Sequence, residues 1–420
     1  MAPATPTGRH DVSAETFPRE RAAGQPVTEG WEGRIRQRLD GIVADGRWRS
    51  PRDFDARGPA GVLVDGGHSD GGREVVSFAS NDYLGLSAHP TVVAAAHDAV
   101  DRWGAGSGGS RLVTGSRPVH HQLEAAVADW KGTEAAICYP TGYAANLGVL
   151  SVLGTAGARI LSDELNHASI IDGCRLARAD VAVYRHADPD HVDRLLAASD
   201  HPALVVTDTV FSMDGDVAPL ADLAAVCRRH RAALVLDEAH AVLGPHPGPD
   251  VTDDLLVVRV GTLSKTLGAL GGFVAAPRPV VDLLINASRP YIFTTAGSPA
   301  DAAAGLAALG VLRSTDGAHR CARLADLVDR LAPGHPTPIV PVVLGTEHRA
   351  VAASAALLDR GLWVPAIRPP TVPVGTSRLR VTLSAAHTDH HVDRLVAALA
   401  AVASPEVGAG PGVTVGLAAR

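Results

Sequence analysis

Lysine is almost missing from this sequence of 420 residues: of its 38 lysine and arginine side chains, only Lys131 and Lys265 are lysines. A guanidinium keeps its proton in proteins, whereas an amine can lose its proton and form a Schiff base. A lysine that is present despite this strong preference for arginine is therefore a candidate catalytic residue. Lys131 follows a helical pattern and precedes Gly132, where a cation suits a helix C-terminus. Lys265 has no such explanation.

The sequence also lacks paired cysteines. Cys138, Cys174, Cys227 and Cys321 lie far apart and form no C-x-x-C motif. This spacing argues against a structural zinc site and against a disulfide scaffold. We expect buried free thiols in a reducing compartment, and we predict no metal site.

Long apolar runs and basic stripes are missing as well. No stretch approaches the roughly 18 apolar residues of a membrane span, and the N-terminal segment lacks the apolar core of a signal peptide. The net charge is −7, without a basic stripe interleaved with aromatics, which argues against nucleic acid as a partner. With 46% hydrophobic and 20% charged residues, the composition predicts a soluble, cytoplasmic protein.

What is present is an alternation of helical patterns with short apolar runs bounded by turn residues. The runs predicted as strands are 135–140, 159–163, 181–186, 203–210, 233–240, 255–263 and 271–277. The helical patterns include 31–44, 119–130, 142–153, 189–198 and 218–231. Almost wholly apolar strands separated by helices predict an α/β fold with a mostly parallel sheet, in which ligands bind at the carboxyl ends of the strands. The polar residues expected at those ends are Asp163, Asp208, Asp237, His240, Thr262 and Lys265.

The same patterns predict a domain organisation. We expect a flexible tail over 1–30, an N-terminal helix and arm over 31–75, a large α/β domain over 76–300, a smaller C-terminal α+β domain over 301–403 and a second flexible tail over 404–420.

Three features combine into a candidate site. Lys265 lies in GTLSKTLGALGG, where small residues admit a planar ligand and where Thr262 or Ser264 can donate to a phosphate. Asp237 ends an apolar strand, where a buried carboxylate needs a cation such as a protonated pyridine nitrogen. His240 follows three residues later. Together they favour a pyridoxal phosphate (PLP) site.

Longer stretches carry a resemblance to a known family. They are SNDYLGLSAHP (80–90), GSGGSRLVTGSRPVHHQLE (106–124), TGYAAN (141–146), DELNHASIIDG (163–173), VFSMDGDVAPL (210–220), LDEAH (236–240) and GTLSKTLGALGG (261–272). With them the chain resembles the α-oxoamine synthases, a family of fold-type I PLP transferases. The resemblance implies a large domain with a mostly parallel seven-stranded sheet, a smaller C-terminal α+β domain and a homodimer with shared active sites.

The resemblance also implies roles for individual residues. Lys265 would hold PLP as an internal aldimine, Asp237 would pair with the pyridinium, His240 would hydrogen-bond the ring hydroxyl and His167 would stack on the ring; these four form the implied catalytic set. Further cofactor-binding residues implied are Gly142, Tyr143, Ser212, Thr262, and Thr294 or Thr295 reaching the neighbouring subunit's phosphate. The substrate-binding residues implied are Arg49, Asn81, His167, Arg368, Thr371 and Arg380, with Arg380 on the amino-acid carboxylate.

One stretch narrows the substrates. AIRPPTVPVGTSRLRVTLSAAH (366–387) most resembles family members that condense L-alanine with a pimeloyl thioester, of CoA or of acyl carrier protein, in biotin biosynthesis. A sister enzyme that uses glycine or serine with another acyl thioester is an alternative, and a catalytically idle paralogue that acts as a binding partner is another. The loop after LDEAH reads AVLGPHPGPD, shorter than in relatives and without their glycine-rich pattern, which leaves acyl-substrate entry open.

Overall fold

A computed structural model describes residues 30–45, 47–65 and 72–403, whose contacts divide the chain into two compact units. Of the described residues, the first unit takes in 30–45, 47–56, 61–65 and 72–74, and the second takes in 57–60 and 75–403. The predicted tails lie outside the described residues, apart from Gly30. The predicted domain boundary at residue 300 stays a prediction.

The first unit holds one helix and an antiparallel strand pair. Helix α1 (Trp31–Ala44) has the bounds predicted from its pattern. Strand β1 (Arg52–Ala56) pairs with β2 (Ala60–Asp65), with Arg52 opposite Asp65.

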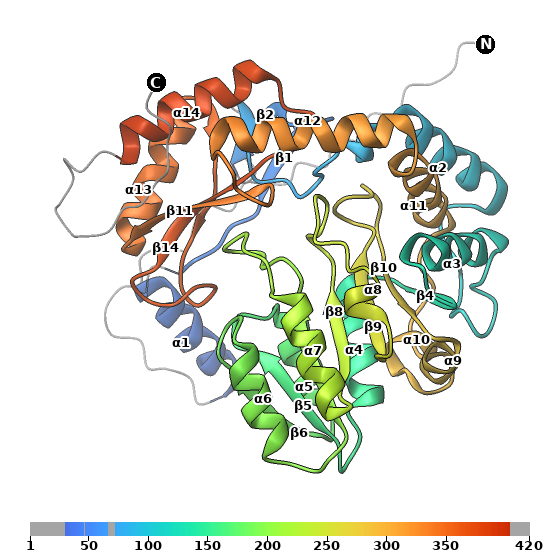
Figure 1. Ribbon diagram of the computed structural model, residues 1–420. Coiled ribbons are helices and arrows are strands. Elements are labelled where there is room, and N and C mark those ends of the chain that lie inside the picture. The colour runs from blue at the N-terminus through green and yellow to red at the C-terminus, as the bar shows by residue number, and fades with distance from the viewer. Residues whose placement is uncertain (1–29, 46, 66–71, 404–420) are drawn as a thin grey trace, which may run out of the picture. The chain divides into compact units, whose positions relative to one another are not determined.

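The centre of the second unit is a seven-stranded sheet (Figure 1). Its strands are β4 (Ala135–Tyr139), β5 (Arg159–Asp163), β6 (Asp180–Tyr184), β7 (Ala203–Asp208), β8 (Ala233–Asp237), β9 (Val257–Thr262) and β10 (Gly272–Ala276). The spatial order is β4-β10-β9-β8-β7-β5-β6, and only β10 runs antiparallel to its neighbours. All seven predicted strands are therefore confirmed, as is the mostly parallel sheet.

Helices cover both faces of this sheet, which explains why its strands are apolar along their whole length. On β8, Leu234 and Leu236 pack into one core cluster with residues of α6 and α7, while Val235 packs into another with residues of α4 and α5. Between residues 86 and 312 the helices are α2 (Pro90–Trp103), α3 (Pro118–Lys131), α4 (Gly142–Leu153), α5 (Ala168–Leu176), α6 (Pro189–Ala197), α7 (Leu220–His230), α8 (Pro249–Thr252), α9 (Arg278–Ala287), α10 (Arg289–Ile292) and α11 (Pro299–Leu312), with a 3₁₀ turn, η1, at Leu86–Ala88.

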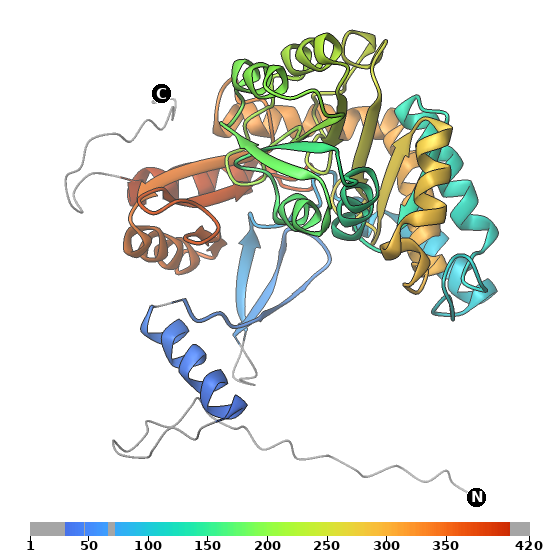
Figure 2. The same ribbon diagram turned by 90° about the horizontal axis from the view of Figure 1, so that it is seen from below.

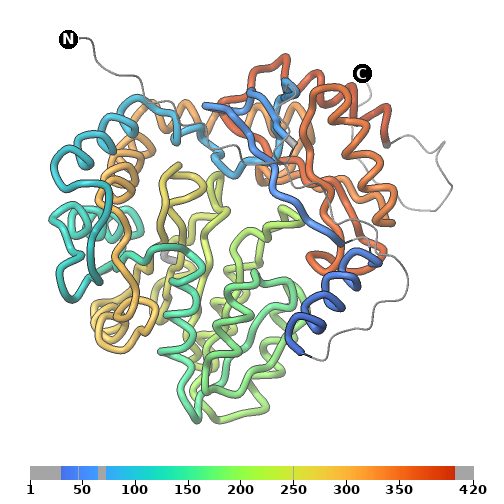
Figure 3. Tube along the Cα trace, turned by 180° about the vertical axis from the view of Figure 1, so that it is seen from behind, coloured from blue at the N-terminus to red at the C-terminus, as the bar shows by residue number. Residues whose placement is uncertain are grey.

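Segments distant in sequence meet at one end of the sheet. Helix α11 packs along α2 and also contacts α3, as the adjacent orange and cyan coils of Figure 3 show. None of the described helices is long and apolar enough to cross a membrane.

The C-terminal part of the second unit builds a three-stranded antiparallel sheet of order β11-β14-β13. Its elements are α12 (Thr315–Leu331), β11 (Ile339–Gly345), α13 (Glu347–Leu358), β13 (Ala366–Ile367), β14 (Ser377–Thr382) and α14 (Asp389–Ala403). Helix α13 lies beside β11 and β14, as Figure 2 shows. The short β12 (Leu362–Trp363) instead pairs in parallel with the end of β3 (Arg73–Ser77).

Candidate active site

The predicted site residues gather at the carboxyl edge of the seven-stranded sheet. Asp237 ends β8 directly opposite Asp208, which ends β7, and Thr262 ends β9 three residues before Lys265. Because parallel strands end at the same edge, these side chains share one region, as the sequence predicted.

Lys265 stands at one end of a hydrogen-bonded chain. Its Nζ lies 2.8 Å from Nε2 of His240, whose Nδ1 contacts the hydroxyl of Tyr83. Burial, together with the positive charges of Lys265 and Arg380, holds the pKa of His240 well below its usual value, so the ring is neutral. A neutral imidazole accepts at one nitrogen and donates from the other. The ring can therefore accept from Lys265 while it donates to Tyr83.

The chain continues to a buried arginine. Tyr83 Oη donates to Asn81 Oδ1 at 3.3 Å, and Arg380 Nη2 donates to the same oxygen at 3.1 Å. Arg380 is 5% exposed, and its Nε donates to the carbonyl oxygen of Ser212 at 2.5 Å. The structure thus brings Asn81, Ser212 and Arg380 together, although Ser212 contributes its backbone here.

Asp237 and His167 meet through a second network. Asn146 Nδ2 donates to Asp237 Oδ2 at 2.7 Å and to Ser169 Oγ at 2.9 Å. Ser169 Oγ in turn lies 2.7 Å from Nδ1 of His167, the residue that caps α5. The other carboxylate oxygen of Asp237 accepts from the amide of Ala239 at 2.9 Å. The ring of His167 is held through its Nδ1 and meets the ring of Tyr143 edge-on, with the ring centroids 6.5 Å apart.

Asp208 lies beside Asp237 and is equally buried. Burial and the neighbouring charge of Asp237 raise the pKa of Asp208 well above its usual value. Its Oδ2 accepts from the amide of His167 at 2.8 Å. Asp208 therefore fixes the backbone from which His167 projects.

A cradle forms where α4 begins. Thr141 caps this helix by accepting from the amide of Ala144 at 3.0 Å. A side chain on Gly142 would lie 3.2 Å from Cβ of Thr262, so the helix start and the end of β9 approach closely. Thr262 Oγ1 also lies 2.7 Å from Ser264 Oγ. The first amides of a helix are donors that suit a phosphate, and Tyr143 supplies one of them.

These residues fit PLP on three points. A lysine amine stands where an aldehyde can reach it, and the amides of a helix N-terminus offer donors for a phosphate beside Thr262, whose hydroxyl here donates to the carbonyl of Gly271 at 2.9 Å. Asp237 is 5% exposed, and within the described ranges no basic side chain forms an ion pair with it. A buried carboxylate of this kind suits a cationic ring nitrogen.

The amine itself is tuned by the surrounding charges. Burial lowers the pKa of Lys265, and Arg380 lowers it further, although Asp237 and Asp208 oppose the change. The amine therefore loses its proton more readily than an ordinary lysine does, which a nucleophile and base requires.

Other predicted residues are not joined to this cluster by the contacts described above. Arg368 and Thr371 share a turn after β13, in which the Thr371 amide donates to the Arg368 carbonyl at 3.1 Å. Thr294 and Thr295 follow α10, and Arg49 belongs to the first unit. Their roles stay predictions.

Tyr83, Asn146 and Asp208 were absent from the predicted site set. Tyr83 and Asn146 lie within SNDYLGLSAHP and TGYAAN, two of the stretches that carried the family resemblance, and Asp208 was expected only as a polar strand end. Apart from the contact between Tyr83 and Asn81, their partners are distant in sequence, so no local pattern indicated them.

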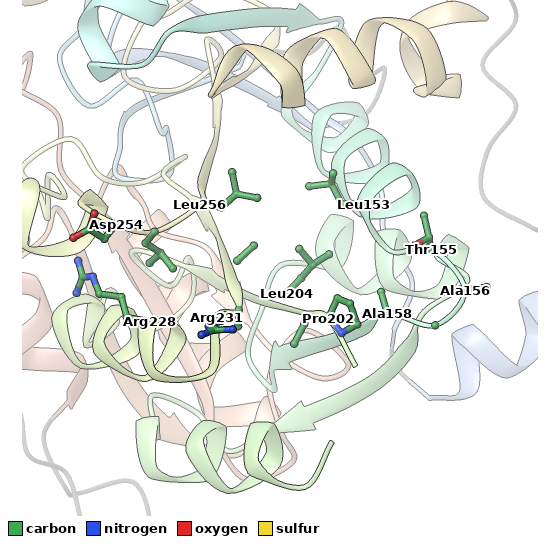
Figure 4. A pocket seen from close by; sticks show the side chains of 15 residues that line it. Leu153, Thr155, Ala156, Ala158, Pro202, Leu204, Arg228, Arg231, Asp254 and Leu256 are labelled. Carbon is green, nitrogen blue, oxygen red and sulfur yellow. The ribbon is translucent and has the colours of Figure 1, made fainter. Parts of the chain in front are cut away.

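A cavity of about 530 Å³ opens elsewhere, at the amino ends of the parallel strands (Figure 4). Leu153, Leu204 and Leu256 line it together with Arg228 and Arg231. None of the predicted site residues lines this cavity.

Comparison with known proteins identifies the fold and the family of the chain. The second unit has the fold of the fold-type I PLP-dependent enzymes. The chain belongs to the family of class I and II aminotransferases, whose model matches residues 73–399.

Individual relatives extend the likeness over nearly the whole chain. An 8-amino-7-oxononanoate synthase from Anaeromyxobacter dehalogenans is 52% identical over 391 residues, which cover 89% of this chain and 96% of the relative. A protein of the same name from Burkholderia thailandensis is 48% identical, covering 86% of this chain and 95% of its own. Among solved structures, a lysine-to-alanine variant of serine palmitoyltransferase from S. paucimobilis with a bound PLP–myriocin aldimine has a TM-score of 0.80 at 31% identity, covering 89% of this chain and 98% of its own.

Proposed function

We propose that this protein condenses L-alanine with a pimeloyl thioester to give 8-amino-7-oxononanoate, CO2 and the free thiol, with PLP as its cofactor. The observation that carries the proposal is Lys265 Nζ at 2.8 Å from His240, at the strand edge that also bears the buried Asp237. The identity of 52% to a synthase of that name, over nearly all of both chains, supports the substrates.

The chain's own residues divide the work. Arg380 would hold the alanine carboxylate, Asp237 would pair with the ring nitrogen of PLP, and His167 would stack on its ring. When bound, PLP supplies an electron-withdrawing ring that stores the negative charge left on the alanine α-carbon. Lys265 Nζ takes the α-proton as a base, which its lowered pKa favours.

Two binding roles complete the assignment. Gly142, Tyr143 and Thr262 bind the phosphate at the start of α4, where helix amides and a hydroxyl converge. Arg49, Arg368 and Thr371 face the acyl substrate. A homodimer in the cytoplasm, with Thr294 or Thr295 reaching the partner's phosphate, completes the predicted assembly.

The sister activity, with glycine or serine and a different thioester, is the second candidate. It is favoured by the structural likeness to serine palmitoyltransferase, at 31% identity. The higher identity to the synthases, 47–52%, favours L-alanine.

The test offers L-alanine, glycine and L-serine to the purified, PLP-loaded protein, each with pimeloyl-CoA and with pimeloyl acyl carrier protein. Product masses identify the reaction. We expect the product of L-alanine, together with a change in the visible absorption of the cofactor when L-alanine is added. A product from glycine or serine alone would keep the family and overturn the substrate. Failure to bind PLP would overturn the proposal as a whole.

A further inference from the structure

His186, which follows β6, has one aspartate partner on each side of its ring. Its Nδ1 lies 3.0 Å from Asp163 Oδ1, and its Nε2 lies 2.7 Å from Asp216 Oδ2. The edge of its ring also packs against the buried Phe211, with the ring centroids 4.4 Å apart. None of these residues belongs to the site described above.

The two contacts fix the charge of the ring. A carboxylate only accepts hydrogen bonds, so a ring between two carboxylates must donate from both nitrogens and be cationic. Hydrogen bonds to Asp163 and Asp216 accordingly raise the pKa of His186 to about 10, although its burial opposes the change. At neutral pH the ring is an imidazolium with two charge-assisted hydrogen bonds, the strong kind.

The first of these contacts leads to His167. Asp163 ends β5, and its Oδ1 also accepts from the amide of Leu165 at 2.9 Å, within the turn that leads into α5. Asn166, next in this turn, donates to the Val206 carbonyl at 2.9 Å. His167 closes the turn as the cap of α5. We call residues 163–167 the His167 turn.

The second contact leads to Arg380. Asp216 lies in residues 210–217, which we call the Ser212 loop and which closes on itself through a bridge between Val210 and Val217. Within this loop the carbonyl of Ser212 accepts from Arg380 Nε at 2.5 Å, and Asp214 pairs with Arg378. The loop is therefore the surface on which the arginines of β14 rest.

We propose that His186 is a positioning residue for the condensation: it ties the His167 turn to the Ser212 loop and so sets His167 and Arg380 relative to each other. This inference rests on the proposed function for the roles of His167 and Arg380. The side chain of His186 contacts Asp163, Asp216 and Phe211, and none of these three is predicted to bind the cofactor or the substrate.

Two substitutions separate the two contacts. The amide nitrogen of asparagine can take the place of Nδ1, so His186→Asn retains a donor to Asp163 and loses the contact with Asp216. The longer glutamine reaches the place of Nε2, so His186→Gln retains a donor to Asp216 and loses the contact with Asp163. Each variant is neutral, so loss of the charge is common to both and the difference between them reports the separate contacts.

His230 provides a matched control. Its Nε2 lies 2.9 Å from Asp193, and its side chain is 25% exposed, close to the 23% of His186. The pair joins α6 to α7 and contacts no predicted site residue. His230→Asn thus removes a histidine–carboxylate contact of similar exposure away from the site, and His230→Gln, which keeps a donor at the place of Nε2, shows the effect of the exchange alone.

The readouts are the visible circular dichroism of bound PLP, its dissociation constant, and kcat and KM for the amino acid. We expect His186→Asn to raise KM for L-alanine about tenfold, the worth of one charged hydrogen bond, while the cofactor's dichroism stays near wild type. We expect His186→Gln to change the dichroism and weaken PLP binding about tenfold, with a smaller effect on KM.

Opposite outcomes overturn the positioning role. It fails if both His186 variants match the His230 controls, or if they lower only the unfolding temperature while dichroism, PLP affinity and KM stay at wild-type values. If the wild-type protein turns over glycine or serine instead of L-alanine, the proposed function fails. The His186 variants are then compared by their KM for that amino acid. The PLP measurements test His186 in either case.

Discussion

Replacing each of the two lysines in turn should separate stability from catalysis. Lys131 ends α3 as predicted, but its ammonium lies 2.6 Å from Glu238 Oε2, and the two side chains are 8% and 2% exposed. Arg259 binds the other oxygen of Glu238 at 2.8 Å. Lys131 also lies 3.7 Å from the ring centroid of Trp130. A buried carboxylate is thus shared between two cations.

The loss of folding stability expected for Lys131→Met can be estimated from these contacts. Leaving a buried charge wholly unpaired costs about 3–5 kcal/mol, and the remaining Arg259 reduces that cost. The lost contact with Trp130 adds about 1 kcal/mol, whereas methionine keeps the packing of the aliphatic stem. We therefore expect a loss of about 3 kcal/mol in the free energy of unfolding, or a urea midpoint lower by about 1 M.

The assay is urea unfolding of PLP-loaded protein, followed by tryptophan fluorescence, beside kcat/KM for the condensation. Lys131→Met should keep wild-type kcat/KM, because Lys131 contacts no predicted site residue. Lys265→Met should do the reverse: it should lose turnover without loss of stability, because burial already opposes the charge of Lys265. A Lys131→Met variant as stable as wild type to within about 0.5 kcal/mol would refute the reasoning.

Four further predictions concern Glu238 and, in the candidate active site, Lys265, Tyr83 and Asn146. Burial alone would raise the pKa of Glu238, but Lys131 and Arg259 outweigh it and lower the pKa, so their stabilisation is present above the unfolded-state pKa and is lost as pH falls through the folded-state value. The stability gap between wild type and Lys131→Met should therefore narrow as the pH falls below the unfolded-state pKa of glutamate, about 4.3, and a gap that stays constant below that pH in urea melts would contradict this. Lys265→Ala should abolish product formation in the thioester assay, and near-normal turnover would exclude its proposed role. Tyr83→Phe removes the hydroxyl between His240 and Asn81, and it should lower kcat/KM for L-alanine about tenfold at an unchanged unfolding temperature; equal kinetics would show the hydroxyl to be dispensable. Asn146→Leu leaves Asp237 Oδ2 without its donor, so PLP titration should show about tenfold weaker binding.

How far the sequence predicted the structure depended on whether a signal was local. Strands such as 159–163 and helices such as 142–153 were located to the residue, because apolar runs bounded by turn residues record burial on both faces of a sheet. The same signal predicted Asp237 at the carboxyl edge of the sheet, whereas Lys265 was singled out because lysine is so rare in this sequence. The helical ending at Lys131 was also correct.

What could not be predicted was which distant side chain each of these residues meets. The sequence near Lys131 did not indicate that its ammonium forms an ion pair with Glu238. The sequence near His186 did not indicate a partner in the Ser212 loop. Tyr83 was missed although its stretch was recognised, because its hydroxyl acts through the remote His240. Such contacts depend on how the crossovers bring strand ends together, which local patterns do not record.

The hydrogen-bonded chain from Lys265 through His240, Tyr83 and Asn81 to Arg380 has a consequence for how variants of this protein are read. Groups joined in one network do not contribute independently, and their double mutants deviate from additivity. A loss measured at Arg380 therefore includes part of what the amine at the far end of the chain contributes. If Arg380 anchors the substrate and Lys265 takes the proton, as proposed, the two roles form one energetic unit, whose parts only a thermodynamic cycle can apportion.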